Sequence, residues 1–111
     1  MSDPVFFPSP DEMRDWLAAN HESAEKLWVG LYKKGGSKSG ITMQGAIDQA
    51  LCFGWIDTKG MRIDDDRWMV RFVPRRPKSN WSDRNIARVS ELIAEGVMHD
   101  SGRRAFERRG D

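Results

Sequence analysis

The stretch 71–88 holds the densest group of residues in the sequence that could do chemistry. It carries six basic side chains and one acidic side chain. Pro74 and Pro77 restrict its backbone, so its arginines lose less entropy when they bind. Arginine makes forked, two-point contacts with phosphate or carboxylate groups. The segment therefore has the composition of an anion-binding site.

A helix start next to this segment strengthens that prediction. Ser82 is a suitable N-cap, and a helix N-terminus presents free N–H groups and a positive dipole end to an anion. Trp81 could stack on a base or another ring. We predict that nucleic acid or a phosphorylated ligand binds here, through Arg71, Arg75, Arg76, Lys78, Trp81, Ser82, Arg84 and Arg88. The alternative is structural: Trp81 belongs to the core, Arg71 pairs with a buried acid, and the other charges form a solvated face.

Acidic residues suggest two further functions. Asp48 and Asp57 could act as the acid and base of a small enzyme, although a structural ion pair of Asp48 with Arg71 or Lys33 is the simpler interpretation. The run 64–66 (DDD) is too short and irregular for a calcium loop and predicts a turn. Together with Asp57, this run could form an acidic surface that binds cationic peptides.

The remaining reactive residues favour structural roles. Cys52 lies in an apolar stretch, where burial raises the pKa of a thiol, and no histidine is near it in sequence. Two isolated histidines and one cysteine do not predict a metal site, so we expect no metal and no cofactor. The loop 34–40 is rich in glycine but lacks the phosphate-loop pattern. It could still contribute Lys34 or Lys38 to a partner.

Chain length restricts the number of domains, and the distribution of charge indicates the kind of partner. The 111 residues of the chain fit a single domain, 1–111. Residues 1–66 carry 7 basic and 11 acidic side chains, and residues 67–111 carry 11 and 6. This asymmetry indicates either an anionic partner for the basic half or attraction between the halves.

Three features predict a cytoplasmic protein. The single cysteine fits a reducing compartment. No apolar run approaches the length of a membrane span, and the N-terminus lacks the pattern of a secretory signal.

Periodicity and capping signals predict seven elements. Helices are expected near 10–20, 43–53, 83–95 and 100 onward, the first with a capping box of Ser9 and Glu12. The third would bury Ile86, Val89, Leu92 and Ile93. Strands are expected at 27–34, 55–63 and 68–73, the last with Trp68, Val70 and Phe72 on one face. The order α-β-α-β-β-α-α predicts an α+β fold, in which a mixed or antiparallel sheet of about three strands packs with about four helices.

Five segments resemble the YdeI/OmpD-associated family of small bacterial proteins. They are 27–30 (LWVG), 48–57 (DQALCFGWID), 72–77 (FVPRRP), 81–82 (WS) and 85–89 (NIARV). The resemblance extends from about Phe7 to Phe106. It implies a bacteriocin-protection or stress-related role, associated by name with porins and resistance to cationic peptides, and it supplies no catalytic residues. We expect this chain to lack the basic, helical C-terminal segment often found in that family.

Overall fold

Local capping signals explain where the helices begin in the computed structural model, which describes residues 3–109. The helices are α1 (Pro10–Asn20), α2 (Met43–Cys52), α3 (Asp83–Ala94) and α4 (Asp100–Glu107). Thr42 caps α2, where its hydroxyl oxygen accepts a hydrogen bond from Gly45 N at 2.9 Å. The capping box predicted for α1 is wrong, because the Ser9 hydroxyl donates to the Glu12 carboxylate and caps no backbone N–H.

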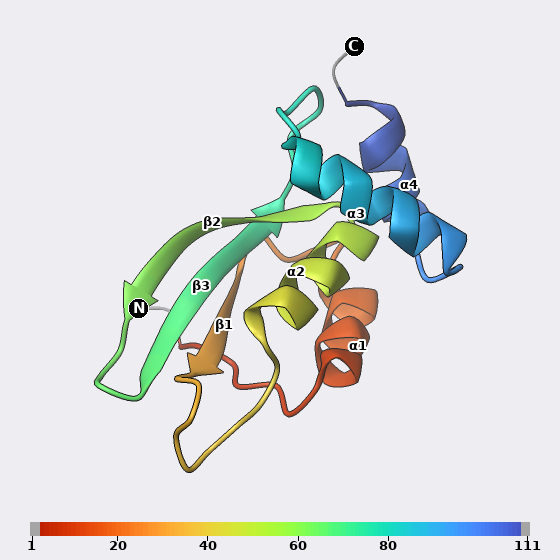
Figure 1. The fold of residues 1–111 in the computed structure, drawn as a ribbon. Helices are drawn as coiled ribbons and strands as arrows, with labels where there is room; N and C mark the ends of the chain where they lie inside the picture. Colours follow the sequence, from red (N-terminus) through yellow and green to blue (C-terminus); the bar gives the residue numbers. More distant parts are fainter. Residues whose placement is uncertain (1–2, 110–111) are drawn as a thin grey trace.

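Three strands form an antiparallel sheet in the order β1-β3-β2 (Figure 1). They are β1 (Leu27–Tyr32), β2 (Trp55–Arg62) and β3 (Arg67–Pro74). β2 and β3 form a hairpin across the predicted turn at 64–66, and α2 connects β1 to β2. The predicted α+β class and the order α-β-α-β-β-α-α are therefore confirmed.

The two faces of the sheet differ in burial because side chains alternate along each strand. One face carries Leu27 and Val29 of β1 opposite Phe72 and Val70 of β3, and all four are buried. Trp68 shares this face as predicted, but it lies near the start of β3 and is 37% exposed. The other face is half-buried or exposed at every position along β1 and β3 except Gly30.

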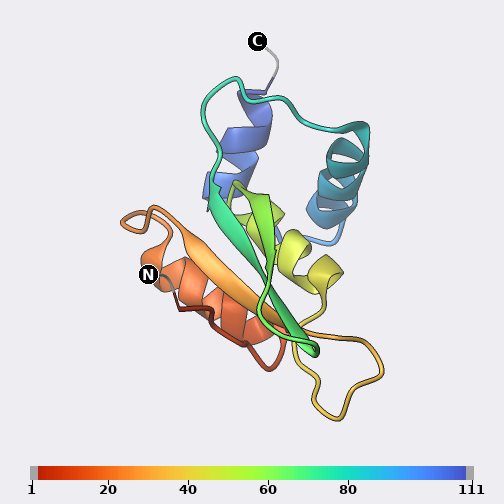
Figure 2. The same cartoon turned by 90° about the vertical axis from the view of Figure 1, so that its left-hand side faces the viewer.

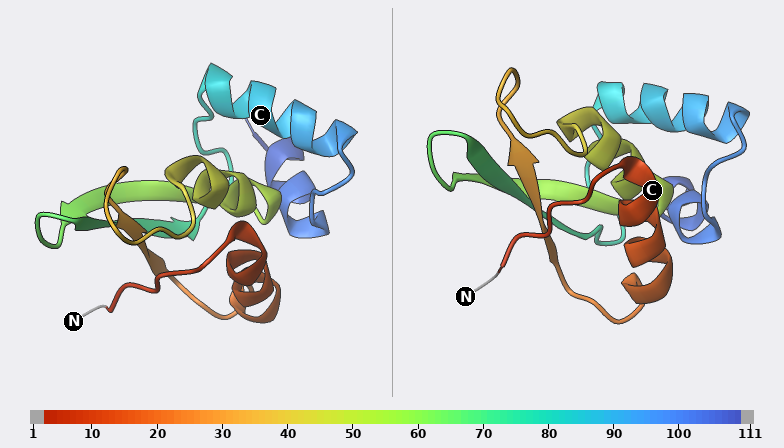
Figure 3. Two further views of the ribbon diagram at one scale, coloured as in Figure 1. Left: turned by 60° about the horizontal axis from the view of Figure 1, so that its bottom comes forward. Right: turned by 90° about the horizontal axis from the view of Figure 1, so that it is seen from below.

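Helix α2 lies at the centre of the packing, since it contacts β2 and each of the other three helices (Figure 3). Large side chains fill the core around it, and Trp16 of α1 meets Trp55 of β2 edge to face at 6.1 Å. Val89 and Leu92 of α3 are buried as predicted. The predicted burial of Ile93 is wrong: it is 43% exposed, since α3 turns only a narrow stripe toward α2.

Helix α4 docks closely on the end of α2. His99 N donates to Cys52 O at 3.0 Å, and Ser101 Oγ donates to Phe53 O at 3.1 Å. A Cβ at Gly102 would lie only 2.1 Å from Cys52 O, so glycine is required for this approach. Gly54, at φ +79°, turns the chain between α2 and β2.

The N-terminal segment runs alongside β1 before it enters α1 (Figure 2). Val5 N donates to Trp28 O and Gly30 N donates to Val5 O, both at 2.8 Å, which makes a parallel bridge between Val5 and Val29. The ring of Phe6 lies over Gly30, where a Cβ would come within 2.5 Å of it. No helix within residues 3–109 is long and apolar enough to cross a membrane.

Candidate anion-binding site

The loop 75–81 connects β3 to α3 and is anchored at both ends. At its start, Arg75 N donates to Gly54 O at 2.9 Å. At its end, Ser82 caps α3 by accepting a hydrogen bond from Asn85 N at 3.1 Å. Between them Lys78 adopts a φ of 63°, a left-handed conformation that lets the loop reverse. The loop therefore folds back on itself around its first side chain.

That side chain, Arg75, is only 9% exposed. The Trp81 ring lies 3.6 Å from the centre of its guanidinium, and the edge of Phe106 from α4 lies against Trp81 with ring centroids 5.5 Å apart. Arg75 Nη1 reaches Asn80 O at 3.4 Å and Ser79 Oγ at 3.5 Å, both long for hydrogen bonds. A cation–π contact and weak polar contacts thus hold the guanidinium in place.

The charge on Arg75 is not compensated by a paired carboxylate. Its Nε and Nη2 atoms are buried and have no hydrogen-bond partner within residues 3–109. Burial lowers the pKa of Arg75 to about 10, and the charge of Asp57 opposes this effect. The group still carries its proton at neutral pH. A buried cation without a partner is costly, so an acceptor from outside the chain would stabilise it.

A hollow of about 810 Å³ is lined in part by Arg75 and defines the site, which we call the Arg75 hollow. One wall is the loop 22–26 between α1 and β1, and the other is formed by β2, β3 and the start of the loop 75–81. Arg71 and Arg76 also line it, and Arg71 Nε is oriented by a 3.0 Å hydrogen bond to Thr58 Oγ1. Glu22, Glu25 and Lys26 lie on the opposite wall.

Only part of the predicted basic set meets at this hollow. Arg71, Arg75 and Arg76 line it, and Lys78 is exposed at the tip of the loop. Trp81 packs against the core and under Arg75, and the Ser82 hydroxyl caps α3. Trp81 is poorly placed for the predicted stacking on a base, because Arg75 already covers one face of its ring.

Arg84 and Arg88 line a separate hollow of about 610 Å³, together with residues of α2 and Asp57. Arg88 donates from Nε and Nη2 to the two carboxylate oxygens of Asp48, both at 2.9 Å. It also contacts Glu91 at 3.0 Å and Glu95 at 3.6 Å, and these carboxylates raise its pKa. Arg88 is therefore fully paired.

The predicted partners of Asp48, Arg71 or Lys33, are wrong: the partner is Arg88, forty residues away. Burial alone would raise the pKa of Asp48, but hydrogen bonds from Arg88 and Gln44 outweigh it and lower the pKa. A carboxylate held ionised in this way is a poor general acid. Asp57 lines the same hollow but is exposed.

The acidic run 64–66 is also largely neutralised. Asp64 Oδ2 binds Arg67 Nη2 at 2.7 Å, and Asp65 pairs with Arg62. The residues on either side of the run are joined by a hydrogen bond from Ile63 N to Arg67 O at 3.0 Å. The run is thus the predicted turn between β2 and β3, and two of its three carboxylates already have cationic partners.

Two histidines that are far apart in the sequence lie next to each other in the structure. The rings of His21 and His99 lie 4.9 Å apart, and His99 stacks on Phe53 at 4.6 Å. Burial raises the pKa of the nearby Cys52 thiol, whose side chain is buried, as predicted. Within residues 3–109 no three His, Cys, Asp or Glu side chains are grouped to hold a metal ion.

The geometry defines a small α+β domain whose distinctive feature is a buried, unpaired arginine beside an open hollow. The chain belongs to the family described as a domain of unknown function (DUF8412), whose model matches residues 5–105. Neither the curated proteins nor the solved structures include a significant match.

Proposed function

We propose that this chain is a non-catalytic binding module that holds an anionic group, from nucleic acid or a phosphorylated ligand, in the Arg75 hollow. The observation that carries the proposal is the Arg75 guanidinium, which is 9% exposed and has unpaired Nε and Nη2 atoms. These two atoms form one edge of the guanidinium fork, and an oxyanion matches such an edge with two oxygens. Because both atoms are buried, an anion in the hollow would reach them only after a shift of the loop 75–81, and it would then supply the missing acceptors and compensate the charge.

The surroundings of Arg75 favour phosphate over a neutral acceptor. Arg71, Arg76 and Lys26 add three positive charges to the same hollow, and Glu22 and Glu25 add two negative charges. Arg71 is already oriented by Thr58, so it loses little freedom on binding. The Trp81 ring contacts the face of the Arg75 guanidinium at 3.6 Å and helps to hold it. The site is thus preorganised for a group that carries more than one negative oxygen.

Two predictions from the sequence remain part of this proposal. A cytoplasmic location fits the buried, unpaired thiol of Cys52. Kinship with the YdeI/OmpD-associated proteins rests on the five similar segments, two of which contribute Asp57, Arg75 and Arg76 to the two hollows.

The alternative functions have less support. An enzyme that uses Asp48 and Asp57 would need a carboxyl group that gains and loses a proton near neutral pH, and Arg88 keeps Asp48 ionised. Binding of cationic peptides would need free carboxylates, and arginines already pair with Asp64 and Asp65. The remaining carboxylates, Asp57 and Asp66, are exposed, so they carry no burial cost that a ligand would relieve.

An NMR amide titration with inorganic phosphate tests the proposal. We expect saturable shifts in residues 75–79 and in the facing loop 22–26, weaker at physiological than at low salt because Arg71 and Arg76 are partly exposed. Arg75→Met, which keeps an unbranched apolar stem, should abolish these shifts. Arg76→Gln should weaken binding about tenfold without touching the buried group.

Arg84→Met is the matched control, because this exposed arginine follows the same loop but lines the other hollow. It should bind phosphate like the wild type. Shifts that centre on the first turn of α3, or that persist in both Arg75→Met and Arg76→Gln, would assign the anion to another place. The absence of any localised shift at low salt would refute the proposed site.

A further inference from the structure

A row of aromatic side chains runs along β1 on the sheet face opposite the core. In the register of the sheet Trp28 lies beside Arg71, Gly30 beside Met69, and Tyr32 beside Arg67. Phe6 fills the place above Gly30, and its ring lies 4.9 Å from that of Tyr32. Alternate residues of a strand are about 6.8 Å apart. Three rings therefore follow one another along β1, those of Trp28, Phe6 and Tyr32, and we call them the aromatic row.

The aromatic row is accessible on the open sheet face. Trp28, Phe6 and Tyr32 are each half-buried, and none packs into the main core. Met61 of β2 lies level with Gly30 on this face and is 41% exposed. The main contact between a helix and the sheet is that of α2 with β2, and within residues 3–109 no helix packs on β1 to a comparable extent.

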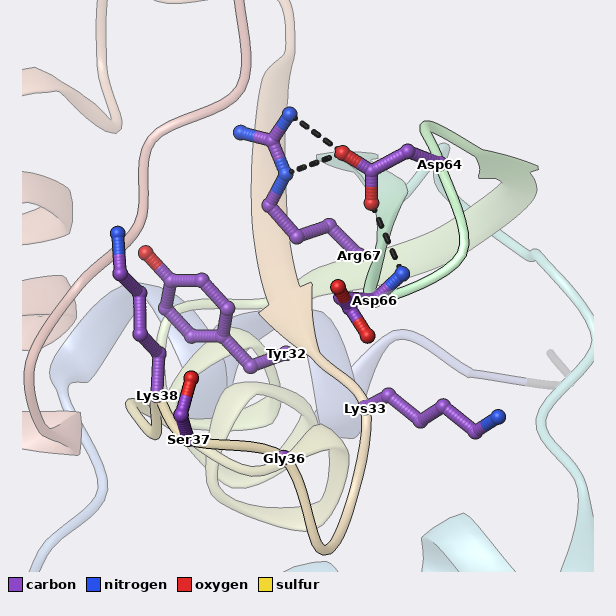
Figure 4. A pocket seen from close by; sticks show the side chains of 8 residues that line it. All are labelled: Tyr32, Lys33, Gly36, Ser37, Lys38, Asp64, Asp66 and Arg67. Atoms are coloured by element: carbon purple, nitrogen blue, oxygen red, sulfur yellow. Dashed lines mark hydrogen bonds and ion pairs between the residues drawn. The ribbon is translucent and has the colours of Figure 1, made fainter.

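Cationic groups lie at both ends of the aromatic row. At the Trp28 end, Arg71 lies beside Trp28 and lines the Arg75 hollow. At the Tyr32 end, a third hollow of about 240 Å³ is lined by Tyr32, Lys33 and Lys38 together with Arg67, Asp64 and Asp66 (Figure 4). Neither lysine forms an ion pair within the described residues 3–109, whereas Arg67 is paired with Asp64. Positive charge thus flanks the aromatic rings at both ends, and at the Tyr32 end Asp64 and Asp66 offset part of it.

We propose that this line binds a single-stranded nucleic acid, with bases stacked on Trp28 and its neighbours in the aromatic row and phosphates held by Arg71 and the Arg75 hollow at one end and by Lys33 and Lys38 at the other. The proposal rests on the anion site proposed above and names its ligand. It also assigns the stacking surface to β1 instead of Trp81, whose ring is covered by Arg75.

The chemistry favours a single strand over other occupants of this face. Proteins that bind single strands combine a positively charged track with aromatic rings on which successive bases stack. A duplex hides the faces of its bases, so it would leave the aromatic row unused. An acidic protein would use the cations but has no need of evenly spaced rings. A second copy of this chain would bring the same positive charges against each other.

The test compares a single-stranded oligothymidine of about 12 nucleotides, within the range of known site sizes, with its duplex, with polyglutamate and with inorganic phosphate, all by amide NMR and fluorescence anisotropy. We expect the single strand to bind at least about tenfold more tightly than the duplex. Its amide shifts should follow residues 28–32 and 69–71 and reach the Arg75 hollow. The other probes should leave the amides of 28–32 unshifted.

Two variants locate the bases. Trp28→Ala should weaken binding of the single strand by about five- to a hundredfold, the range measured for loss of one stacked base, and should leave phosphate binding at the Arg75 hollow unchanged. Trp28→Phe, which keeps a ring, should restore most of the affinity and serves if the alanine variant does not fold. Trp68→Ala is the control, because this partly exposed tryptophan belongs to the same sheet but lies on the other face.

The outcomes separate this inference from the proposed function. If phosphate binds at Arg75 but the single strand binds no better than duplex or polyglutamate, the inference is overturned and the anion site stands. The same holds if Trp28→Ala binds the strand like the wild type, or if sedimentation shows a wild-type dimer that Trp28→Ala converts to a monomer. If the strand shifts 28–32 while phosphate has no effect at Arg75, the inference gains support and the anion site is lost.

Discussion

Arg75 and Arg88 come from the same basic stretch but differ in burial and in ion pairing. Arg88 is held by Asp48 at 2.9 Å and by two glutamates, whereas Arg75 is more deeply buried and has unpaired nitrogen atoms. Arg88 joins α3 to α2, and its charge is already compensated. Arg75 closes a loop and keeps part of its binding capacity free. Local density of positive charge therefore indicates a candidate region, but the availability of acceptors decides which arginine can bind a ligand.

Removing the partner of Arg88 should produce the largest effect. Asp48→Ala eliminates two charge-assisted hydrogen bonds between α2 and α3, and we expect the free energy of unfolding to fall by about 2 kcal/mol. Chemical denaturation measures this change, with Asp15→Ala as a control at an exposed aspartate of α1. A double-mutant cycle with Arg88→Ala should show that most of the loss is shared between the two residues. Additive losses would contradict the assigned pair.

Protonation of Asp48 should have a somewhat smaller effect, because the neutral carboxyl still forms hydrogen bonds. Since its pKa is lowered in the folded state, the pair contributes stability above the unfolded pKa of about 3.9, and this contribution is lost as the pH falls through the folded pKa. Denaturation curves at several acidic pH values should show a shallower acid limb in Asp48→Ala than in the wild type. Parallel limbs would show that other carboxylates dominate.

Replacement of Arg75 should change stability little. Arg75→Met removes a buried, incompletely paired charge and also the cation–π contact with Trp81, and these effects oppose each other. We expect the free energy of unfolding to change by less than about 1 kcal/mol, in contrast to Asp48→Ala, while phosphate binding is lost. A loss as large as that of Asp48→Ala would mean that Arg75 is chiefly structural and would remove the contrast with Arg88.

The smallest effect should come from His99 and should be independent of both arginines. Burial, assisted by His21, lowers the pKa of His99. The unfolded chain therefore takes up the proton more readily, and stability should decline as the pH falls through about 6.5. His99→Asn keeps a residue that can cap α4 and should flatten the profile between about pH 7 and 5. If Arg75→Met flattened it instead, the assignment to His99 would be wrong.

Most of the fold follows from signals within a few residues of each other. Ser82 caps α3 as predicted, Thr42 caps α2, Gly54 turns the chain at a positive φ, and Val70 and Phe72 alternate into the core. Each of these features depends on local geometry that the residue types themselves determine. For this reason all seven elements could be placed from the sequence.

The composition of the site could be predicted only in part, because it depends on contacts between distant residues. Nothing near Asp48 in sequence identifies Arg88, and nothing near Trp81 shows that Arg75 and Phe106 cover it. The aromatic row did leave a signal, since Trp28 and Tyr32 are four residues apart on one strand face. Phe6 completes the row across 24 residues of sequence, which no local pattern reveals.

The short bridge between Val5 and Val29 has a consequence for how molecules of this protein meet one another. β1 is an outer strand of the sheet, and an outer strand with free N–H and C=O groups can recruit strands from other chains and start aggregation. Val5 occupies part of that edge with its own backbone groups, and Phe6 blocks the approach over Gly30. Val5 and Phe6 thus reduce the length of the β1 edge that is open to a strand from another molecule.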